Sequence, residues 1–276
     1  MPKIACLDLI LEVTRRCNMK CCHCLRGDAE DLDMPHDVIK NLFAEIRSTD
    51  ILTFSGGEPS LAVPVMRDAL QECVRNNIDI REVYIVTNGL VVSDEFIQIC
   101  RDWDAYCLNR QLVPVRNDRY TGGSEAHRML KNVLENTGGE RVGCMVSLSL
   151  DTYHDDIPFG NLIRLAAMPH LLLDKAHEDD DVQDWILCEG RAAFNGLGDP
   201  DMRAKAPWNY GDAGRSIDLE INQDGSAYVE ELYVNAEGGL LKDCNFSYEA
   251  QEDYILGRVD GPGWAGRFIE AHKDED

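Results

Sequence analysis

The feature that most constrains the fold is an alternation of apolar strands and amphipathic helices in the first hundred residues. The segments expected as buried strands are Ala5–Val13, Ile51–Phe54 and Val83–Val86. The segments with apolar residues at helical spacing are 35–46, 62–75 and 93–102. Alternation with short connections predicts right-handed crossovers and a parallel sheet, whose ligands gather at the carboxyl ends of the strands.

Beyond residue 103 the alternation is interrupted and then resumes. We interpret residues 104–142, approximately, as an insertion, with a helix expected at 124–136 before the Gly138-Gly139 break. The later expected elements are a strand at 144–150, a helix at 161–167, and strands at 170–173 and 184–188.

The C-terminal part changes character after a stretch rich in glycine, proline and aspartate at 195–214. Apolar and polar residues alternate at 217–221, and Asp224-Gly225 joins them to 227–229, which predicts a β-hairpin. We therefore expect a core domain at residues 1–194 and a small extension at residues 195–276.

Charge and cysteine content limit the classes of partner. The formal net charge of −23 repels phosphate backbones and anionic bilayers, so we expect no extended nucleic-acid contact and no membrane contact. An odd cysteine count of 11 favours metal-binding and core thiols in a reducing compartment over a disulfide framework. With no secretory pattern at the start of the sequence, we expect a cytoplasmic protein.

Three cysteines follow the first expected strand with the spacing C-x3-C-x2-C. Cys17, Cys21 and Cys24 lie on one short loop, where three thiolates can face a single inorganic centre. Soft sulfur selects an iron–sulfur cluster, zinc or copper(I) over hard cations. Nearby Arg15-Arg16 and Lys20 either attract an anionic ligand or balance the charge of the centre.

Zinc is the alternative to an iron–sulfur cluster at this loop. Cys22 or His23 would then supply the fourth ligand, but ligands adjacent in sequence suit a tetrahedral site poorly. Later in the sequence there is no second C-x2-C pair to complete a zinc site. The spacing therefore favours the cluster.

The cysteine loop resembles the signature of the radical S-adenosylmethionine (radical SAM) superfamily. The resemblance implies that Cys17, Cys21 and Cys24 bind three irons of a [4Fe–4S] cluster, whose fourth iron stays open for S-adenosylmethionine. It extends over about residues 5–192 and implies an α/β fold, a partial (β/α)6 barrel of the radical SAM type, here with a small C-terminal extension that contains the β-hairpin.

A Gly-Gly-Glu-Pro segment after the second expected strand matches another motif of that family. By this resemblance Gly56, Gly57, Glu58 and Pro59 bind the methionine amino group of S-adenosylmethionine. Glycine lets the backbone approach a ligand closely, and a carboxylate accepts from an ammonium group. Taken alone, the segment is more often an ordinary turn. Its place one strand after the cysteines favours the cofactor role.

Polar residues at later strand ends are further cofactor candidates. The resemblance implies that Asn88, Ser149 and Asp151 lie near the ribose and carboxylate of S-adenosylmethionine, and that His23 neighbours the adenine. For Ser149 and Asp151, a capped strand-to-helix turn is an equal alternative.

Two more groups complete the candidate site. Arg191, in a Gly-Arg-Ala segment that resembles some peptide-modifying radical enzymes, is expected to reach the cofactor carboxylate. Tyr153 and His154 are the candidate catalytic residues, with a surface position as the alternative for His154. The C-terminal part lacks the cysteine array of auxiliary clusters, which predicts one cluster.

The resemblance implies a radical SAM enzyme. A one-electron donor such as a flavodoxin or ferredoxin reduces the cluster, S-adenosylmethionine is cleaved to a 5′-deoxyadenosyl radical, and that radical abstracts hydrogen from a substrate. A peptide or protein is the preferred substrate, and a small molecule or nucleotide is the alternative. A non-catalytic iron–sulfur or zinc sensor is the hypothesis from another class.

Overall fold

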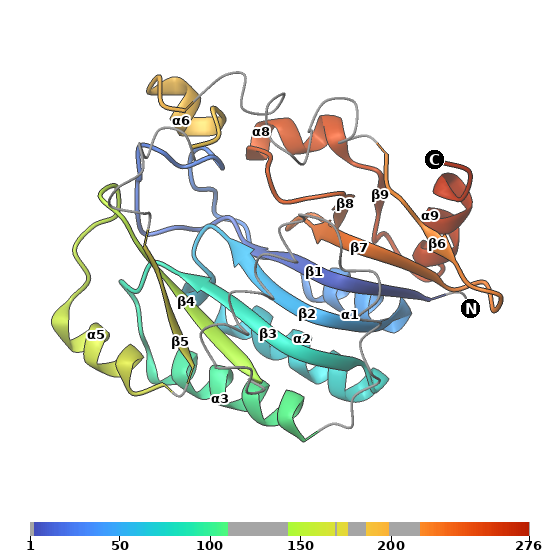
Figure 1. The fold of residues 1–276 in the computed structure, drawn as a ribbon, viewed down its shortest axis with the longest axis horizontal. Helices are drawn as coiled ribbons and strands as arrows, with labels where there is room; N and C mark the ends of the chain where they lie inside the picture. Colours follow the sequence, from blue (N-terminus) through green and yellow to red (C-terminus); the bar gives the residue numbers. More distant parts are fainter. Residues whose placement is uncertain (1–2, 110–142, 169, 176–185, 199–215, 276) are drawn as a thin grey trace.

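The computed structural model describes residues 3–109, 143–168, 170–175, 186–198 and 216–275 (Figure 1). Its centre is a parallel sheet with the strand order β5-β4-β3-β2-β1. The strands are β1 (Ile4–Thr14), β2 (Ile46–Gly56), β3 (Asp79–Thr87), β4 (Cys144–Leu150) and β5 (Leu171–Lys175). All four neighbouring pairs are parallel, which confirms the topology expected from the alternation.

Helices α1 (His36–Glu45), α2 (Val63–Asn76) and α3 (Asp94–Leu108) cover one face of this sheet (Figure 1). The main hydrophobic core lies between them and the strands. α3 begins where the Ser93 side chain accepts from the Phe96 amide. It runs past the expected end because Trp103 and Cys107, both fully buried, continue its apolar face.

The C-terminal part continues the same sheet on the other side of β1. β7 (Ala227–Val234) pairs with β1 in parallel, so that six strands of the described chain run parallel. The predicted hairpin is confirmed, because β6 (Glu220–Ile221) is antiparallel to β7. The remaining elements are β8 (Gly239–Leu241), α8 (Tyr248–Gln251), β9 (Gly257–Arg258) and α9 (Trp264–His272).

Two short helices lie beside the carboxyl ends of the strands (Figure 1). α5 (Phe159–Ala166) lies near β4 and β5, and α6 (Gly190–Phe194) lies near the cysteine loop. Short 3-10 turns cover Pro59–Leu61 and Glu252–Tyr254. The expected α/β fold with a partial barrel is confirmed, because the parallel sheet is open and does not close into a full barrel. In the described ranges, none of the helices combines the length and apolar character that crossing a bilayer requires.

One expected strand is wrong where the structure describes it. Residues 186–188 of the strand predicted at 184–188 belong to no named strand, because the chain there turns toward the cysteine loop. The Arg191 amide, just beyond, donates to the Cys24 carbonyl. The helix predicted at 124–136 lies outside the described residues. The division of the chain at residue 194 stays a prediction.

Candidate cofactor site

The cysteine loop follows β1 and presents its three predicted ligands to one place. Cys17, Cys21 and Cys24 are half-buried, and none is in a disulfide. All three line a pocket above the carboxyl ends of the strands, and all three also line a smaller hollow on the other side of the loop. The three cysteines of the motif therefore lie together in the fold.

The pocket brings together most of the predicted cofactor residues. Its other walls are the ends of β2, β3 and β4 and the loop after β4. Of the predicted residues, those that line it besides the cysteines are His23, Gly56, Gly57, Glu58, Pro59, Asn88, Ser149 and His154. Asp151 and Tyr153 stand beside it, and Arg191 lines the smaller hollow.

Gly56 and Gly57 are required for contact between backbones, a reason that differs from the expected one. A Cβ at Gly56 would lie 2.2 Å from the Thr14 carbonyl oxygen, and one at Gly57 would lie 2.3 Å from the Arg16 carbonyl oxygen. The Gly57 amide donates to Thr14 and the Glu58 amide to Arg16, at 2.7 and 2.8 Å. These glycines therefore hold the end of β2 directly against the cysteine loop.

Glu58 is buried, with 1% exposure, and joins two strand ends. Its Oε1 accepts from the Ser60 amide and the Thr87 hydroxyl, and its Oε2 accepts from the Asn88 amide at 2.8 Å. Burial raises the pKa of Glu58, although these hydrogen bonds act in the opposite direction. The carboxylate therefore joins the strand ends that form the wall of the pocket, which Glu58 lines.

Asn18 and Thr87 belong to the site, although the motif analysis did not assign them a role. The Asn88 side chain donates to Asn18 at 2.9 Å, which links the end of β3 to the cysteine loop. Thr87 supports Glu58 and also accepts from the Gly89 amide. The position of Thr87 at the end of an expected strand could have identified it from the sequence. The pairing of Asn18 with Asn88 is visible only in the folded structure.

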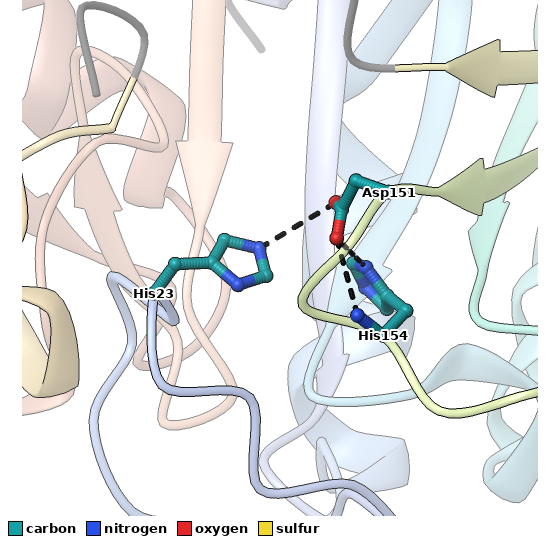
Figure 2. A group of neighbouring side chains, drawn as sticks. All are labelled: His23, Asp151 and His154. Carbon is teal, nitrogen blue, oxygen red and sulfur yellow. Dashed lines mark hydrogen bonds and ion pairs between the residues drawn. The ribbon is translucent and has the colours of Figure 1, made fainter. Parts of the chain in front are cut away.

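His23, Asp151 and His154 form a group at the edge of the pocket (Figure 2). Asp151 lies 3.7 Å from His23 Nε2 and 2.8 Å from His154 Nδ1. The Asp151 carboxylate also accepts from the amides of Tyr153 and His154, which holds the loop after β4. The Tyr153 ring lies 4.8 Å from that of His23. Asp151 thus holds the turn after β4, and its predicted contact with the cofactor stays a prediction.

Arg191 contacts the cysteine loop. Its guanidinium pairs with Asp28 at 2.9 Å and reaches the Cys21 carbonyl oxygen at 3.5 Å. A Cβ at Gly190 would lie 2.3 Å from the Leu25 carbonyl oxygen, so glycine is needed for this approach. Helix α6 therefore packs against the loop through its first residues.

The positive residues next to the cysteines serve the fold. Arg15 is buried, and its guanidinium bonds Glu12, Glu30 and Gln251. Arg16 pairs with Asp33 and also donates to the Leu61 carbonyl. Both guanidinium groups are thus engaged by groups of this chain.

The pKa values of the cysteine thiols bear on the expected metal centre. Burial raises the pKa of Cys17, and burial with the neighbouring Cys24 and Cys17 thiols raises the pKa of Cys21 to about 11. Three thiolates this close repel one another unless bound cations compensate them. Cys22 is exposed and lines neither hollow, so it does not offer zinc a fourth ligand. The donor set fits a [4Fe–4S] cluster with three protein ligands.

Comparison with known proteins identifies the domain. Residues 11–136 match the family model of the radical SAM superfamily. An uncharacterized protein of Methanocaldococcus jannaschii is 27% identical over 35% of the chain and 35% of its own length. A probable GTP 3′,8-cyclase of Methanothermobacter marburgensis is 32% identical over 32% of the chain and 29% of its own length. The match thus spans about a third of these curated relatives.

Solved structures show a weak likeness. The protein anSMEcpe with bound AdoMet and a peptide has a TM-score of 0.49 at 13% identity, covering 98% of this chain and 80% of that chain. Streptococcus suis SuiB with its precursor peptide SuiA has a TM-score of 0.38 at 15% identity, covering 94% and 64%. These scores are too low to support an argument about fold or function.

The match to the family model confirms the resemblance from which the cofactor pair, a [4Fe–4S] cluster and S-adenosylmethionine, was predicted. It covers the end of β1, the cysteine loop, the Gly-Gly-Glu-Pro segment, β2 and β3. Residues 11–136 thus carry the radical SAM family match that the cysteine motif predicted.

Proposed function

We propose that this chain cleaves S-adenosylmethionine reductively at a cluster held by Cys17, Cys21 and Cys24, and removes a hydrogen atom from a substrate. The observation that supports this most is the pocket itself. Three cysteines and the ends of three successive parallel strands line one space, which is where parallel sheets bind ligands.

The cluster and its cosubstrate supply the radical chemistry, and the chain supplies binding and position. A cluster held by Cys17, Cys21 and Cys24 would supply the electron for reductive cleavage of S-adenosylmethionine, and that cleavage would supply the capacity to abstract hydrogen from a substrate. Gly56, Gly57, Glu58 and Pro59 form the wall proposed to receive the methionine amino group. Of these, Glu58 carries the charge that an ammonium group requires.

The other predicted residues take the remaining parts of S-adenosylmethionine in this proposal. Asn88 and Ser149 line the pocket and are proposed to face the ribose and carboxylate, with Asp151 beside them. His23, on the cysteine loop, lines the same pocket and is proposed to neighbour the adenine. Arg191 reaches the cofactor carboxylate only by leaving Asp28, which is itself exposed.

A peptide or protein is the proposed substrate class. The Gly-Arg-Ala segment forms α6, which contacts the cysteine loop through Asn195 and the Cys22 carbonyl. At the end of α6, Phe194 is 90% exposed. An exposed aromatic ring beside the pocket loop gives an extended peptide an apolar contact. We propose a flavodoxin or ferredoxin as the electron donor.

A nucleotide or other small molecule is the second candidate substrate. It is favoured by the similarity of 94 residues to a probable GTP 3′,8-cyclase. Incubating the reduced, cluster-loaded chain with GTP and S-adenosylmethionine tests it, because a nucleotide substrate raises 5′-deoxyadenosine formation and gives a new nucleotide product.

The central experiment is anaerobic reconstitution with iron and sulfide, reduction with dithionite, and measurement of 5′-deoxyadenosine. We expect about four irons per chain, with the iron and the product lost in Cys21→Ala. Cys22→Ala is the matched control, since this exposed neighbour lines neither hollow, and it should retain both. Zinc as the bound metal, with no product, would favour the non-catalytic sensor instead.

A further inference from the structure

The group of His23, Asp151 and His154 offers a second set of metal ligands. One donor atom from each residue lies within 4.8 Å of the others. His23 belongs to the cysteine loop, whereas Asp151 and His154 belong to the loop after β4. Figure 2 shows the two rings on either side of the carboxylate. The group therefore bridges two walls of the pocket.

Two of the three donor groups are already paired. His154 Nδ1 lies 2.8 Å from Asp151, and a hydrogen bond from His154 helps to lower the pKa of the Asp151 carboxyl. His23 Nε2 is 3.7 Å from Asp151, too far for a hydrogen bond, and the buried His23 Nδ1 has no partner. Buried polar atoms are normally paired, so the His23 ring, with Nδ1 unpartnered and Nε2 beyond hydrogen-bonding distance, has room for a further ligand.

The ligand types select the cation. Two imidazoles and one carboxylate are the donor set of divalent transition ions such as Zn²⁺ and Fe²⁺, and they leave coordination positions open. Tetrahedral bonds of about 2.0–2.2 Å place donor atoms about 3.5 Å apart. The three donor atoms here lie within 4.8 Å of one another, so His23 must move closer by about 1 Å at most. Its side chain is partly exposed on a loop, which permits that movement.

We propose that His23, Asp151 and His154 bind one divalent transition cation, separately from the cysteine site. His23 and His154 line the pocket, so the open coordination positions face it. There the cation holds an oxygen donor of the substrate, such as a carboxylate or phosphate. This last role rests on the proposed function, whereas cation binding does not. The charge of −23 on the chain also favours cations.

Zinc binding to the full chain tests the site. The cluster-loaded chain is equilibrated with ZnCl₂, freed of unbound metal and analysed for zinc and iron. We expect one zinc per chain in addition to the cluster iron. Competition with a chromophoric chelator should show about 10-fold or weaker affinity in His154→Ala and in Asp151→Asn. Asp151→Asn keeps the oxygen that accepts from the Tyr153 amide, so the loop is retained.

His36→Ala is the matched control, because His36 forms an exposed pair with Asp68 at 3.0 Å, remote from the pocket. It should bind zinc as the unaltered chain does. Equal affinity in all variants whose circular dichroism shows a folded chain would overturn the proposal. So would the loss of all zinc from a chain in which Cys17, Cys21 and Cys24 are replaced by Ser.

Cobalt(II) provides a second readout that identifies the ligands. We expect the bound cobalt spectrum to lack sulfur-to-metal charge transfer, since the site contains no thiolate. Strong charge transfer would assign the ion to cysteine and overturn the proposal. If zinc fails to bind while the zinc-free chain forms 5′-deoxyadenosine, this inference fails and the proposed function stands.

Discussion

At the scale of single residues, the site depends on polar groups that are almost entirely withdrawn from water. Glu58 is the clearest case, because three donors from two segments converge on its carboxylate. A buried donor that loses its acceptor costs about 1–3 kcal/mol. The pocket wall therefore depends on the Glu58 carboxylate as well as on Gly56 and Gly57.

Replacing Glu58 with alanine should destabilise the chain and weaken cofactor binding together. We expect the free energy of unfolding to fall by about 2–4 kcal/mol, because the Asn88 amide and the Thr87 hydroxyl lose their acceptor. Urea denaturation of the chain measures this. Glu95→Ala, at an exposed residue of α3, should change the free energy by no more than about 0.5 kcal/mol.

The Cys21 thiol should react slowly at neutral pH in the cluster-free chain. Because its pKa is raised to about 11 by burial and by the neighbouring thiols, little thiolate is present at pH 8. Because an ordinary thiol has a pKa of about 9.0, this rise lowers the alkylation rate of Cys21 about 100-fold. The rate should rise with pH up to about 11.

Peptide mass spectrometry after timed iodoacetamide treatment measures that rate. With the cluster bound, Cys17, Cys21 and Cys24 should be protected, while the exposed Cys22 stays reactive. Alkylation of Cys21 at pH 8 as fast as that of an ordinary cysteine would contradict the expected shift.

At the scale of elements, the cysteine loop is held by the ends of its neighbours. The end of β2 approaches it through Gly56 and Gly57, and α6 approaches it through Gly190. Each approach leaves no space for a Cβ. The loop is therefore positioned by backbone contacts, which are stiffer than side-chain contacts and hold the sulfur atoms together before metal binds.

Gly57→Ala should displace the cysteine loop, because the added Cβ would stand 2.3 Å from the Arg16 carbonyl oxygen. We expect a loss of about 2–4 kcal/mol of stability and lower iron content after reconstitution. Gly160→Ala is the matched control, since nothing lies within 4 Å of that position in α5. It should leave iron unchanged and raise stability by about 0.5–1 kcal/mol.

At the scale of the whole molecule, residues of the C-terminal part form hydrogen bonds with the end of β1 and the start of the cysteine loop. Glu12 of β1 is fully buried and accepts from Arg15, Gln251, Tyr233 and the Ala236 amide. Gln251 in turn accepts from Arg15 and Asn235. Residues far apart in sequence thus share one buried polar network directly below the loop.

Gln251→Ala should lower the free energy of unfolding by about 2–3 kcal/mol, because it leaves buried donors of Arg15 and Asn235 without this acceptor. Thermal or urea unfolding measures the change, and iron retention reports on the loop. Gln98→Ala, whose side chain makes an exposed bond to Asp102, is the control and should be nearly neutral. Equal effects of the two changes would contradict the role of the network.

Hydrophobic periodicity and motif spacing determined the parallel α/β core, the place of the cysteines after β1 and the strand ends that form the pocket. These signals are local, because a buried strand or an amphipathic helix is encoded by its own residues. Ala5–Val13 and 144–150 were therefore placed correctly, whereas 186–188, with a short apolar run, were not.

Only the tertiary structure decided which groups, distant in the sequence, contact or hydrogen-bond one another. The sequence does not encode which carbonyl approaches Gly57, that Asn18 pairs with Asn88, or that β7 lies beside β1. Such contacts join residues distant in the chain, and their partners follow from how the layers pack. By itself the sequence determined the loop of three thiols and its cofactors; the fold decided that His23 faces Asp151 across the pocket edge.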